Sequence, residues 1–262
     1  MVRFHLIGEF APGEVIVEAV PDTRPCLPEV EALIDAAWSE AARRPGVHLF
    51  DGPMCRLESF RAEGSHLTLQ LSPTSYKPFL GTNLSHPELA DRFGPVILGN
   101  PVGVSSLLQT SDDVLLLGRR NDSVAYYPGR IHPFAGSLEP QDADVFAAVR
   151  RELEEELSLA DGDLSHMTCA GIAEDARIRQ PELIFRVRTS RSRAQIESSL
   201  DETEHSAIFA LPATRTALEA ALAEPLLTPI ATAALLLWGR AQFGADWFAG
   251  STPSPPWGRG RG

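Results

Sequence analysis

The chain has 262 residues, and its 35 acidic and 23 basic side chains give a formal net charge of −12. This balance argues against nucleic acid as a partner, because phosphate backbones are bound mainly through Lys and Arg. Three widely spaced cysteines predict neither a disulfide framework nor a metal knuckle. We expect a cytoplasmic protein without a secretory leader, since the first ten residues contain no long apolar core.

Residues 1–95 predict a small subdomain that is rich in strands. Residues 15–20 read as a strand, and residues 29–43 carry apolar side chains at helical spacing. Residues 47–72 are expected to form paired strands, because residues 66–71 alternate polar and apolar side chains.

Residues 96–249 predict a second, larger domain. It is expected to begin with a buried strand at 113–118, followed by a turn-rich stretch, a loop at 133–140 and a helix. Further elements are predicted from the apolar pattern of the remaining segments. They are strands at 183–187 and 207–211 and helices at 213–224 and 229–243.

The C-terminal part of the chain predicts a helix at 229–243 and a tail after it. The helix at 229–243 is strongly apolar, so we expect it to be buried or to lie at the seam of a homodimer. Its most apolar part, residues 230–238, is too short to cross a bilayer, and no membrane is expected as a partner. Residues 250–262 are rich in Pro, Gly and Ser and predict a disordered tail.

The helix that follows the loop at 133–140 has an apolar face and an acidic face. Its apolar side chains recur every three or four residues, at Phe146, Val149, Leu153 and Leu157. At about 100° per residue, Glu152, Glu155 and Glu156 fall within an arc of roughly 100° away from that stripe. Three carboxylates this close repel one another, and a hard cation such as Mg²⁺ relieves the repulsion.

A charged run of this kind is usually the solvated face of an amphipathic helix. The order of elements favours a site instead, because a strand, a loop of small residues and an acidic helix follow one another. The loop offers backbone carbonyls and close approach, and the helix offers charge. Glu154 points elsewhere and is expected to be solvated.

Residues 136–159 resemble a Nudix box, the pattern G-x5-E-x7-R-E-U-x-E-E-x-G-U with U aliphatic. Gly136 opens the match, and the second half follows position by position at Arg151, Glu152, Leu153, Glu155, Glu156 and Leu159. The middle glutamate of the family falls at Asp142, one residue too far from Arg151. Ser158 stands at the late glycine, and Ala135 replaces the glycine that usually precedes the box.

A second resemblance runs from about residue 47 to about residue 240. The segments that carry it are Leu49–Pro53, Arg56–Leu57, Thr74–Asn83, Pro101–Val104 and Gly136–Gln141. Together they resemble the Nudix subfamily that hydrolyses UDP-glucose and UDP-galactose, in which the box itself is irregular. The resemblance implies an α/β (α+β) fold, a Nudix α/β/α sandwich with a mixed sheet, joined to the smaller N-terminal β-rich subdomain.

The resemblance also implies a metal site. Glu155 and Glu156 would bind Mg²⁺, or Mn²⁺ in its place. Glu152 would be a further ligand, or would orient or deprotonate the attacking water, and the backbone carbonyl at Ala135 or Gly136 would add an oxygen. Such an ion lowers the pKa of bound water and neutralises charge on the pyrophosphate.

Many family members add one more carboxylate from outside the helix. The candidates here are Glu182 and Glu204, as a ligand or a general base, and the plain alternative for each is an exposed acid at a strand edge. His205, beside Glu204, and His132, beside the loop, are expected near the site, but the histidine spacing does not predict a zinc centre.

Four residues are expected on the substrate side of the site: Tyr76, Asn83, Arg119 and Glu139. For the segment at 74–83 the alternative is a packed loop between subdomains. For Arg119 the alternative is a surface pair with Arg120.

The resemblance therefore predicts a Mg²⁺-dependent hydrolase that cuts the pyrophosphate of a UDP-sugar into UMP and a sugar 1-phosphate. Two alternatives stay open: hydrolysis of another nucleoside diphosphate derivative such as ADP-ribose, and a Nudix-fold protein that binds a nucleotide sugar without turning it over. The intact set of Glu152, Glu155 and Glu156 favours the enzyme, whereas the altered box spacing and Ala135 keep the binding protein open.

Overall fold

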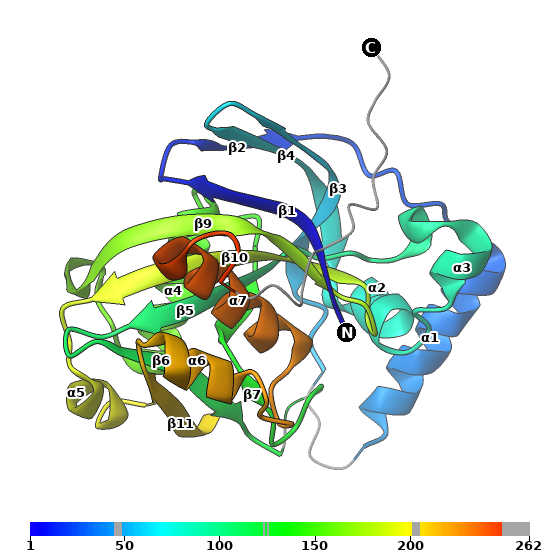
Figure 1. Ribbon diagram of the computed structural model, residues 1–262. Coiled ribbons are helices and arrows are strands. Elements are labelled where there is room, and N and C mark those ends of the chain that lie inside the picture. Colours follow the sequence, from blue (N-terminus) through cyan, green and yellow to red (C-terminus); the bar gives the residue numbers. More distant parts are fainter. Residues whose placement is uncertain (45–48, 123, 125, 201–204, 248–262) are drawn as a thin grey trace.

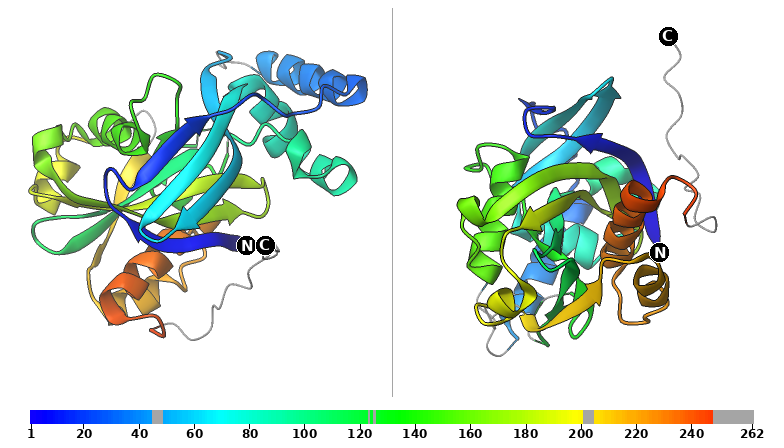
Figure 2. Two further views of the ribbon diagram at one scale, coloured as in Figure 1. Left: turned by 90° about the horizontal axis from the view of Figure 1, so that it is seen from above. Right: turned by 60° about the vertical axis from the view of Figure 1, so that its left-hand side comes forward.

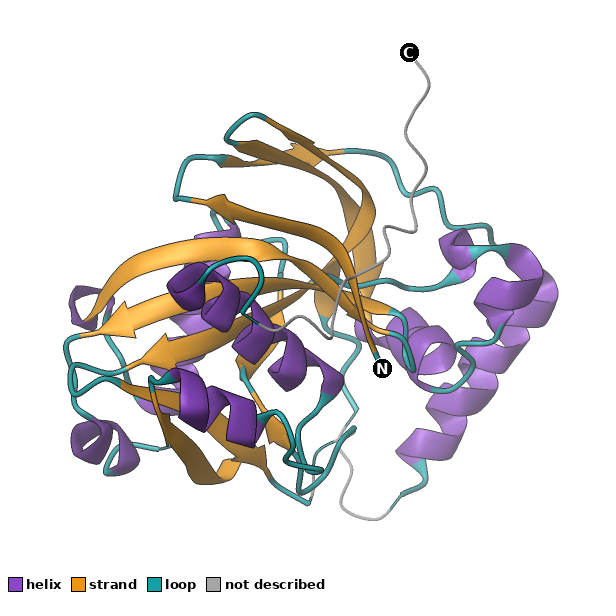
Figure 3. Cartoon of the chain, viewed as in Figure 1, coloured by secondary structure: helices purple, strands orange, loops and turns teal. Residues whose placement is uncertain are grey.

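The computed structural model describes residues 1–44, 49–122, 124, 126–200 and 205–247. Within these ranges the chain forms a large mixed sheet, a small sheet beside it, and helices on both faces of the large sheet (Figures 1 and 3). The described residues contain no helix long and apolar enough to span a membrane.

The small sheet has the strand order β2–β4–β3. Its members are β2 (Val15–Ala19), β3 (Pro53–Glu63) and β4 (His66–Ser75), with β2 parallel and β3 antiparallel to β4. Leu67, Leu69 and Leu71 alternate along β4 and are buried, while the residues between them are more exposed. The alternating pattern of this segment therefore correctly predicts a strand with one buried face.

The large sheet has the strand order β1–β9–β10–β5–β6–β11, with β7 paired to β6 and β8 paired to β5. The pair of β10 and β5 is parallel, and the other pairs are antiparallel. The strands are β1 (Val2–Phe10), β5 (Gly103–Gln109), β6 (Val114–Arg120), β7 (Ile131–His132), β8 (Phe134–Ser137), β9 (Leu164–Asp175), β10 (Gln180–Thr189) and β11 (His205–Pro212).

Helices cover the two faces of the large sheet with separate apolar clusters. Helix α4 (Val145–Leu157) packs with Leu183, Phe185 and the small sheet on one face. Helices α6 (Arg215–Ala221) and α7 (Pro229–Phe243) pack with Leu107 and Ile184 on the other. The residues of β10 therefore alternate between an α4 face and an α7 face, which confirms the α/β/α sandwich.

A third, smaller cluster joins α1 (Pro28–Ala42) to the segment that follows β4. This segment contains α2 (Tyr76–Phe79), a π-helical turn (Leu80–Leu84) and α3 (Leu89–Phe93). A Cβ atom at Gly81 would come within 2.6 Å of the Ile34 Cα, so the close approach of the turn to α1 requires glycine. Figure 2 shows these helices together at one side, away from α6 and α7.

The main predicted elements are confirmed, with shifts at their ends. Helices α1, α4 and α7 and strands β2, β6, β10 and β11 lie where the sequence predicts them. Helix α6 is shorter than the predicted 213–224. Strand β1, within the predicted N-terminal subdomain, pairs with β9 and so belongs to the large sheet. The proposed tail at 250–262 lies outside the described residues.

Candidate active site

Helix α4 is fixed at both ends by local interactions. Asp144 caps its start, accepting hydrogen bonds from the backbone N–H groups of Phe146 and Ala147, both at 2.8 Å. The helix ends where Ser158 takes a left-handed conformation with φ 55°. The predicted apolar stripe is buried, and Glu154 is exposed as expected.

The three clustered glutamates occupy different environments. The side chain of Glu155 is 61% exposed, that of Glu152 is 12% exposed and that of Glu156 is 5% exposed. The acidic face is therefore not a uniformly wet surface. Of its two less exposed members, Glu152 lies against the loop at Gly136 and Glu156 lies against His205 of the sheet.

Glu152 lies against the backbone of the loop that opens the box. A Cβ atom at Gly136 would overlap its carboxylate, so a larger residue there would displace the Glu152 side chain from this position. Burial raises the pKa of Glu152 to about 8, Arg151 opposes this shift, and the nearby charges of Glu156 and Glu155 add to it. The carboxylate therefore sits beside the Ala135–Gly136 backbone, as the resemblance implies.

Arg151 ties the helix to the loop. Its guanidinium contacts the two carboxylate oxygens of Asp142 at 3.1 and 3.2 Å and donates to the Ser137 carbonyl at 3.0 Å. It also contacts Glu152 at 2.6 Å and lies 3.5 Å from Glu155. Asp142 thus anchors Arg151 despite the extra residue between them.

Glu156 forms a buried pair with His205 at the start of β11. Oε1 of Glu156 is 3.1 Å from Nε2 of His205, and both side chains are almost fully buried. The imidazole packs over Gly118, where a Cβ atom would overlap the ring, and edge-on against Phe134 at 5.3 Å. His205 is therefore brought next to Glu156 of the acidic helix.

The described residues contain no group of three or more His, Cys, Asp and Glu side chains already arranged to hold a metal ion. The donor chemistry nevertheless fits a hard divalent cation. The carboxylates of Glu152, Glu155 and Glu156 and the backbone carbonyl of Ala135 offer the oxygen donors that such a cation prefers.

Glu182 lies on the opposite face of the large sheet from α4. It shares its face of β10 with Ile184, which packs under α7. Its carboxylate accepts a hydrogen bond from Ser105 and packs over Gly103, where a Cβ atom would overlap it. Strand β10 is interior and Glu182 is 3% exposed, so the alternative of an exposed acid at a strand edge is wrong for this residue.

Burial raises the pKa of Glu182 to about 7, the hydrogen bond from Ser105 opposes the shift, and the charge of Asp175 adds to it. Glu182, Gly103 and Ser137 lie in one row across the sheet, so Glu182 is at the loop end of the strands even though it faces away from Glu152. The other candidate, Glu204, lies outside the described residues.

The residues expected to contact substrate are not gathered at one point. Tyr76 packs edge-on between Trp38 and Phe79, with ring centroids 6.2 Å apart in each pair. Arg119 is exposed on β6, whereas Arg120 is buried, so the two do not form a surface pair. Glu139 lies in the loop after β8, where its side chain pairs with Gln141.

Asn83 is fully buried and its amide is used within the protein. Its Nδ2 donates to the Ile178 carbonyl at 3.0 Å, and its Oδ1 accepts from the Asn100 N–H at 3.0 Å. Asn83 therefore holds the turn between β9 and β10 against the segment at 74–83. Contact of Asn83 with a substrate stays a prediction.

The structure also shows a polar cluster near Glu182, of which only His132 was expected near the site from the sequence. The Tyr127 hydroxyl donates to Asp175 at 2.5 Å, and the Arg120 guanidinium lies 4.8 Å from the Tyr126 ring centre. Burial raises the pKa of Tyr127. His132 is also buried here, bonded to Thr228 at 2.8 Å, and its burial holds its pKa well below the usual value. No local pattern joins these segments.

Residues 99–228 match the family model of the NUDIX domain. This match spans about half of the chain, and the sandwich fold and the arrangement of loop and α4 agree with a NUDIX domain in this region.

Three curated relatives are named uridine diphosphate glucose pyrophosphatase NUDT22. The protein of Mus musculus is 32% identical, with 64% of each chain covered. That of Homo sapiens is 32% identical over 59% of this chain and 60% of the relative. That of Bos taurus is 29% identical over 84% of this chain and 89% of the relative. The matches thus span less than two thirds of the mouse and human proteins.

Among solved structures, a mutT/nudix family protein from Listeria innocua is similar at 19% identity and a TM-score of 0.43, covering 55% of this chain and 94% of that one. The MutT protein from Methanosarcina mazei Go1 is similar at 18% identity and a TM-score of 0.42, covering 55% and 95%.

Proposed function

We propose that the protein hydrolyses the pyrophosphate of a UDP-sugar, of the UDP-glucose or UDP-galactose type, to UMP and a sugar 1-phosphate with Mg²⁺ as cofactor. The observation that carries this proposal is the close contact between the Glu152 carboxylate and the backbone of Gly136. It joins the acidic helix and the loop into one site. The names of the curated relatives support the choice of substrate.

The metal would be held by Glu152, Glu155, Glu156 and the backbone carbonyl of Ala135. When bound, it supplies positive charge for the pyrophosphate and lowers the pKa of a water molecule. Hydrolysis forms a bond from the oxygen of water to one phosphorus and breaks the bond from the bridging oxygen to that phosphorus. Each phosphorus then ends in a separate phosphate monoester.

The protein side chains divide the remaining work. Glu152 is suited to orient the attacking water or take its proton, because its carboxylate lies beside the loop backbone that would also hold the metal. Arg151 positions Glu152 through the contact at 2.6 Å and holds the loop through Ser137. His205 orients Glu156, in the manner of a residue that supports a ligand from behind.

Glu182 is not suited to act together with Glu152, because the sheet lies between them. Its hydrogen bond with Ser105 instead braces β10 against β5, next to the row that contains Ser137. We infer that Glu182 supports the loop end of the sheet.

The test is a chromatographic assay of UDP-glucose, UDP-galactose and ADP-ribose with Mg²⁺ and with Mn²⁺. Formation of UMP and a sugar 1-phosphate is expected. Turnover of ADP-ribose alone would overturn the proposed substrate while retaining the hydrolase.

A protein that binds a nucleotide sugar without turnover is the second candidate. The hydrogen bond between Glu156 and His205 favours this second candidate. A carboxylate already bound to an imidazole would have to share its charge with a metal ion. Saturable binding of UDP-glucose with no product in either metal would select this candidate.

A further inference from the structure

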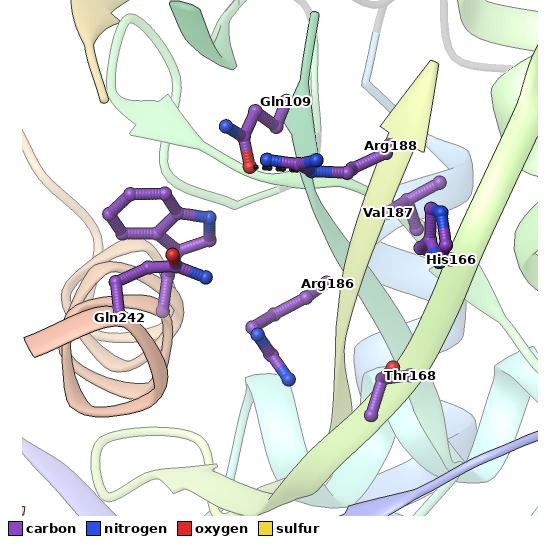
Figure 4. A pocket seen from close by; sticks show the side chains of 8 residues that line it. Gln109, His166, Thr168, Arg186, Val187, Arg188 and Gln242 are labelled. Atoms are coloured by element: carbon purple, nitrogen blue, oxygen red, sulfur yellow. Dashed lines mark hydrogen bonds between the residues drawn. The ribbon is translucent and has the colours of Figure 1, made fainter. Parts of the chain in front are cut away.

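A pocket lies between the ends of three strands and helix α7. The cavity has a volume of about 220 Å³. Its lining comes from β5, β9, β10 and α7 and consists of Gln109, His166, Thr168, Arg186, Val187, Arg188, Trp238 and Gln242. Figure 4 shows Arg186 reaching from β10 into the space before the helix that carries Gln242. The lining is thus mainly polar and includes two guanidinium groups.

The two arginines come from one face of one strand. Arg186 and Arg188 are two residues apart in β10, so their side chains point to the same side of the sheet. This is the α7 face, because Ile184 has the same parity and packs in the cluster under α7. Adjacent side chains of equal charge repel one another, and an anion between them removes that cost.

The charge of these arginines is only partly compensated. Arg186 pairs with Glu9 through one terminal nitrogen, and its buried Nε has no hydrogen-bond partner. Nε of Arg188 donates to Oε1 of Gln109 at 3.2 Å (Figure 4), and Arg188 makes no ion pair with any described residue. One carboxylate therefore faces two guanidinium groups in a chain whose net charge is −12.

The buried Nε of Arg186, which has no hydrogen-bond partner, is stronger evidence for a ligand than the charge of the pocket. A buried N–H group without an acceptor costs about 1–3 kcal/mol, so such groups in folded proteins call for an explanation. An acceptor in the cavity would supply the missing bond. Guanidinium groups match planar and tetrahedral oxyanions through paired N–H donors, and Thr168 and Gln242 offer further polar contacts.

We propose that this pocket binds the phosphate group of a small phosphorylated molecule through Arg186 and Arg188. The cavity is smaller than the roughly 300–1,000 Å³ that is typical of sites for drug-sized ligands, so it suits inorganic phosphate or a short phosphate ester. Both ligands have the same tetrahedral oxyanion, which is the chemistry that the two arginines recognise.

The pocket is separate from the candidate active site. Arg188 lies six residues beyond Glu182 on β10, which corresponds to about 20 Å along the strand. Helix α4 and Glu152 are on the other face of the sheet. Binding here does not depend on the proposed hydrolysis and can be measured in protein without turnover.

The test is calorimetric titration of the full chain with inorganic phosphate and, separately, with glycerol 3-phosphate, in EDTA and at constant ionic strength set with chloride. The variant is Arg188→Gln, because Arg188 is exposed and its replacement leaves the ion pair of Arg186 in place. The control is Arg193→Gln, which makes the same charge change on an exposed helix.

Saturable binding of either probe to the wild type is expected, with a loss of about tenfold or more in affinity in Arg188→Gln and less than about twofold in Arg193→Gln. Tighter binding of glycerol 3-phosphate would identify an ester as the ligand, and binding of phosphate alone would identify the free ion. Absence of saturable binding of both probes, or an equal loss in both variants, would overturn the proposal. Unchanged melting temperatures show that the variants are folded.

Discussion

Nε2 of His205 lies 3.1 Å from Oε1 of Glu156, and both groups are buried where β11 meets α4. This contact holds a glutamate of the acidic helix in the interior, although Glu154 and Glu155 just before it are exposed. The position of Glu156 is therefore set by a partner 49 residues away.

Replacing Glu156 with Gln should lower turnover of the nucleotide sugar by about 100-fold or more, because the change removes a proposed metal ligand while keeping the size of the side chain. Steady-state kinetics with Mg²⁺ would measure the loss. Glu154→Gln is the matched control, since Glu154 is exposed on the same helix. Equal activity of both variants would contradict the assignment of Glu156.

Gly136→Ala should destabilise the fold by about 1–3 kcal/mol, because the added methyl group overlaps the Glu152 carboxylate. In a Glu152→Ala background the same change should cost almost nothing, since the overlapping group is gone. Chemical unfolding of the four proteins of this cycle would measure the coupling. A cost that is the same in both backgrounds would show that the two residues do not touch.

The stability of the protein should depend on pH through Glu182. Its pKa is about 7 in the folded state against 4.5 for the ordinary group, so between these values the unfolded chain releases a proton that the folded chain keeps. The contribution of Glu182 to the free energy of unfolding therefore falls as pH rises from about 4.5 to about 7 and is constant above that range.

Glu182→Gln should remove this dependence. Relative to the wild type, the variant should gain stability between pH 4 and pH 8 by up to about 3 kcal/mol, at about 1.4 kcal/mol for each unit of pKa. Thermal unfolding at a series of pH values would measure the difference. Parallel curves for the two proteins would mean that Glu182 titrates normally.

Ser158→Gly should stabilise the protein by about 0.5–1 kcal/mol. A side chain in the left-handed region costs about 1–2 kcal/mol, and the greater freedom of glycine in the unfolded chain returns part of this. For a chain of this size, the melting temperature should rise by roughly 1–4 °C. Ser158→Ala is the control, and a similar rise in that variant would locate the gain elsewhere than in the backbone.

Asn83 and Tyr76 should respond differently to replacement by Ala. Loss of the Asn83 amide leaves the Ile178 carbonyl and the Asn100 N–H without their partner, so we expect a fall of about 1–3 kcal/mol in stability.

Tyr76→Ala should instead raise the KM for the nucleotide sugar, because this ring is expected on the substrate side of the site. Unfolding curves and kinetics of both variants separate the two roles.

The sequence pattern correctly predicted helix α4 and the spacing of its glutamates, because both depend on residues close together in the chain. The stripe of Phe146 and Leu153 fixes the orientation of α4, and the spacing of the glutamates follows from it. The sequence does not tell which helix covers which face of β10. The separation of Glu182 from Glu152 by the sheet was therefore not predicted. The ion pair of Arg151 with Asp142 likewise depends on the path of the loop, which the altered box spacing did not reveal.

Strand β1 lies beside β9 at the edge of the large sheet, although the small sheet begins only five residues after it ends. A chain shortened to begin at residue 96 would expose the unpaired backbone of β9 and become a template for self-association. Strand β1 thus protects an edge of the large sheet that would otherwise be open to pairing with another chain. We therefore expect a stable protein only when the two regions are expressed together.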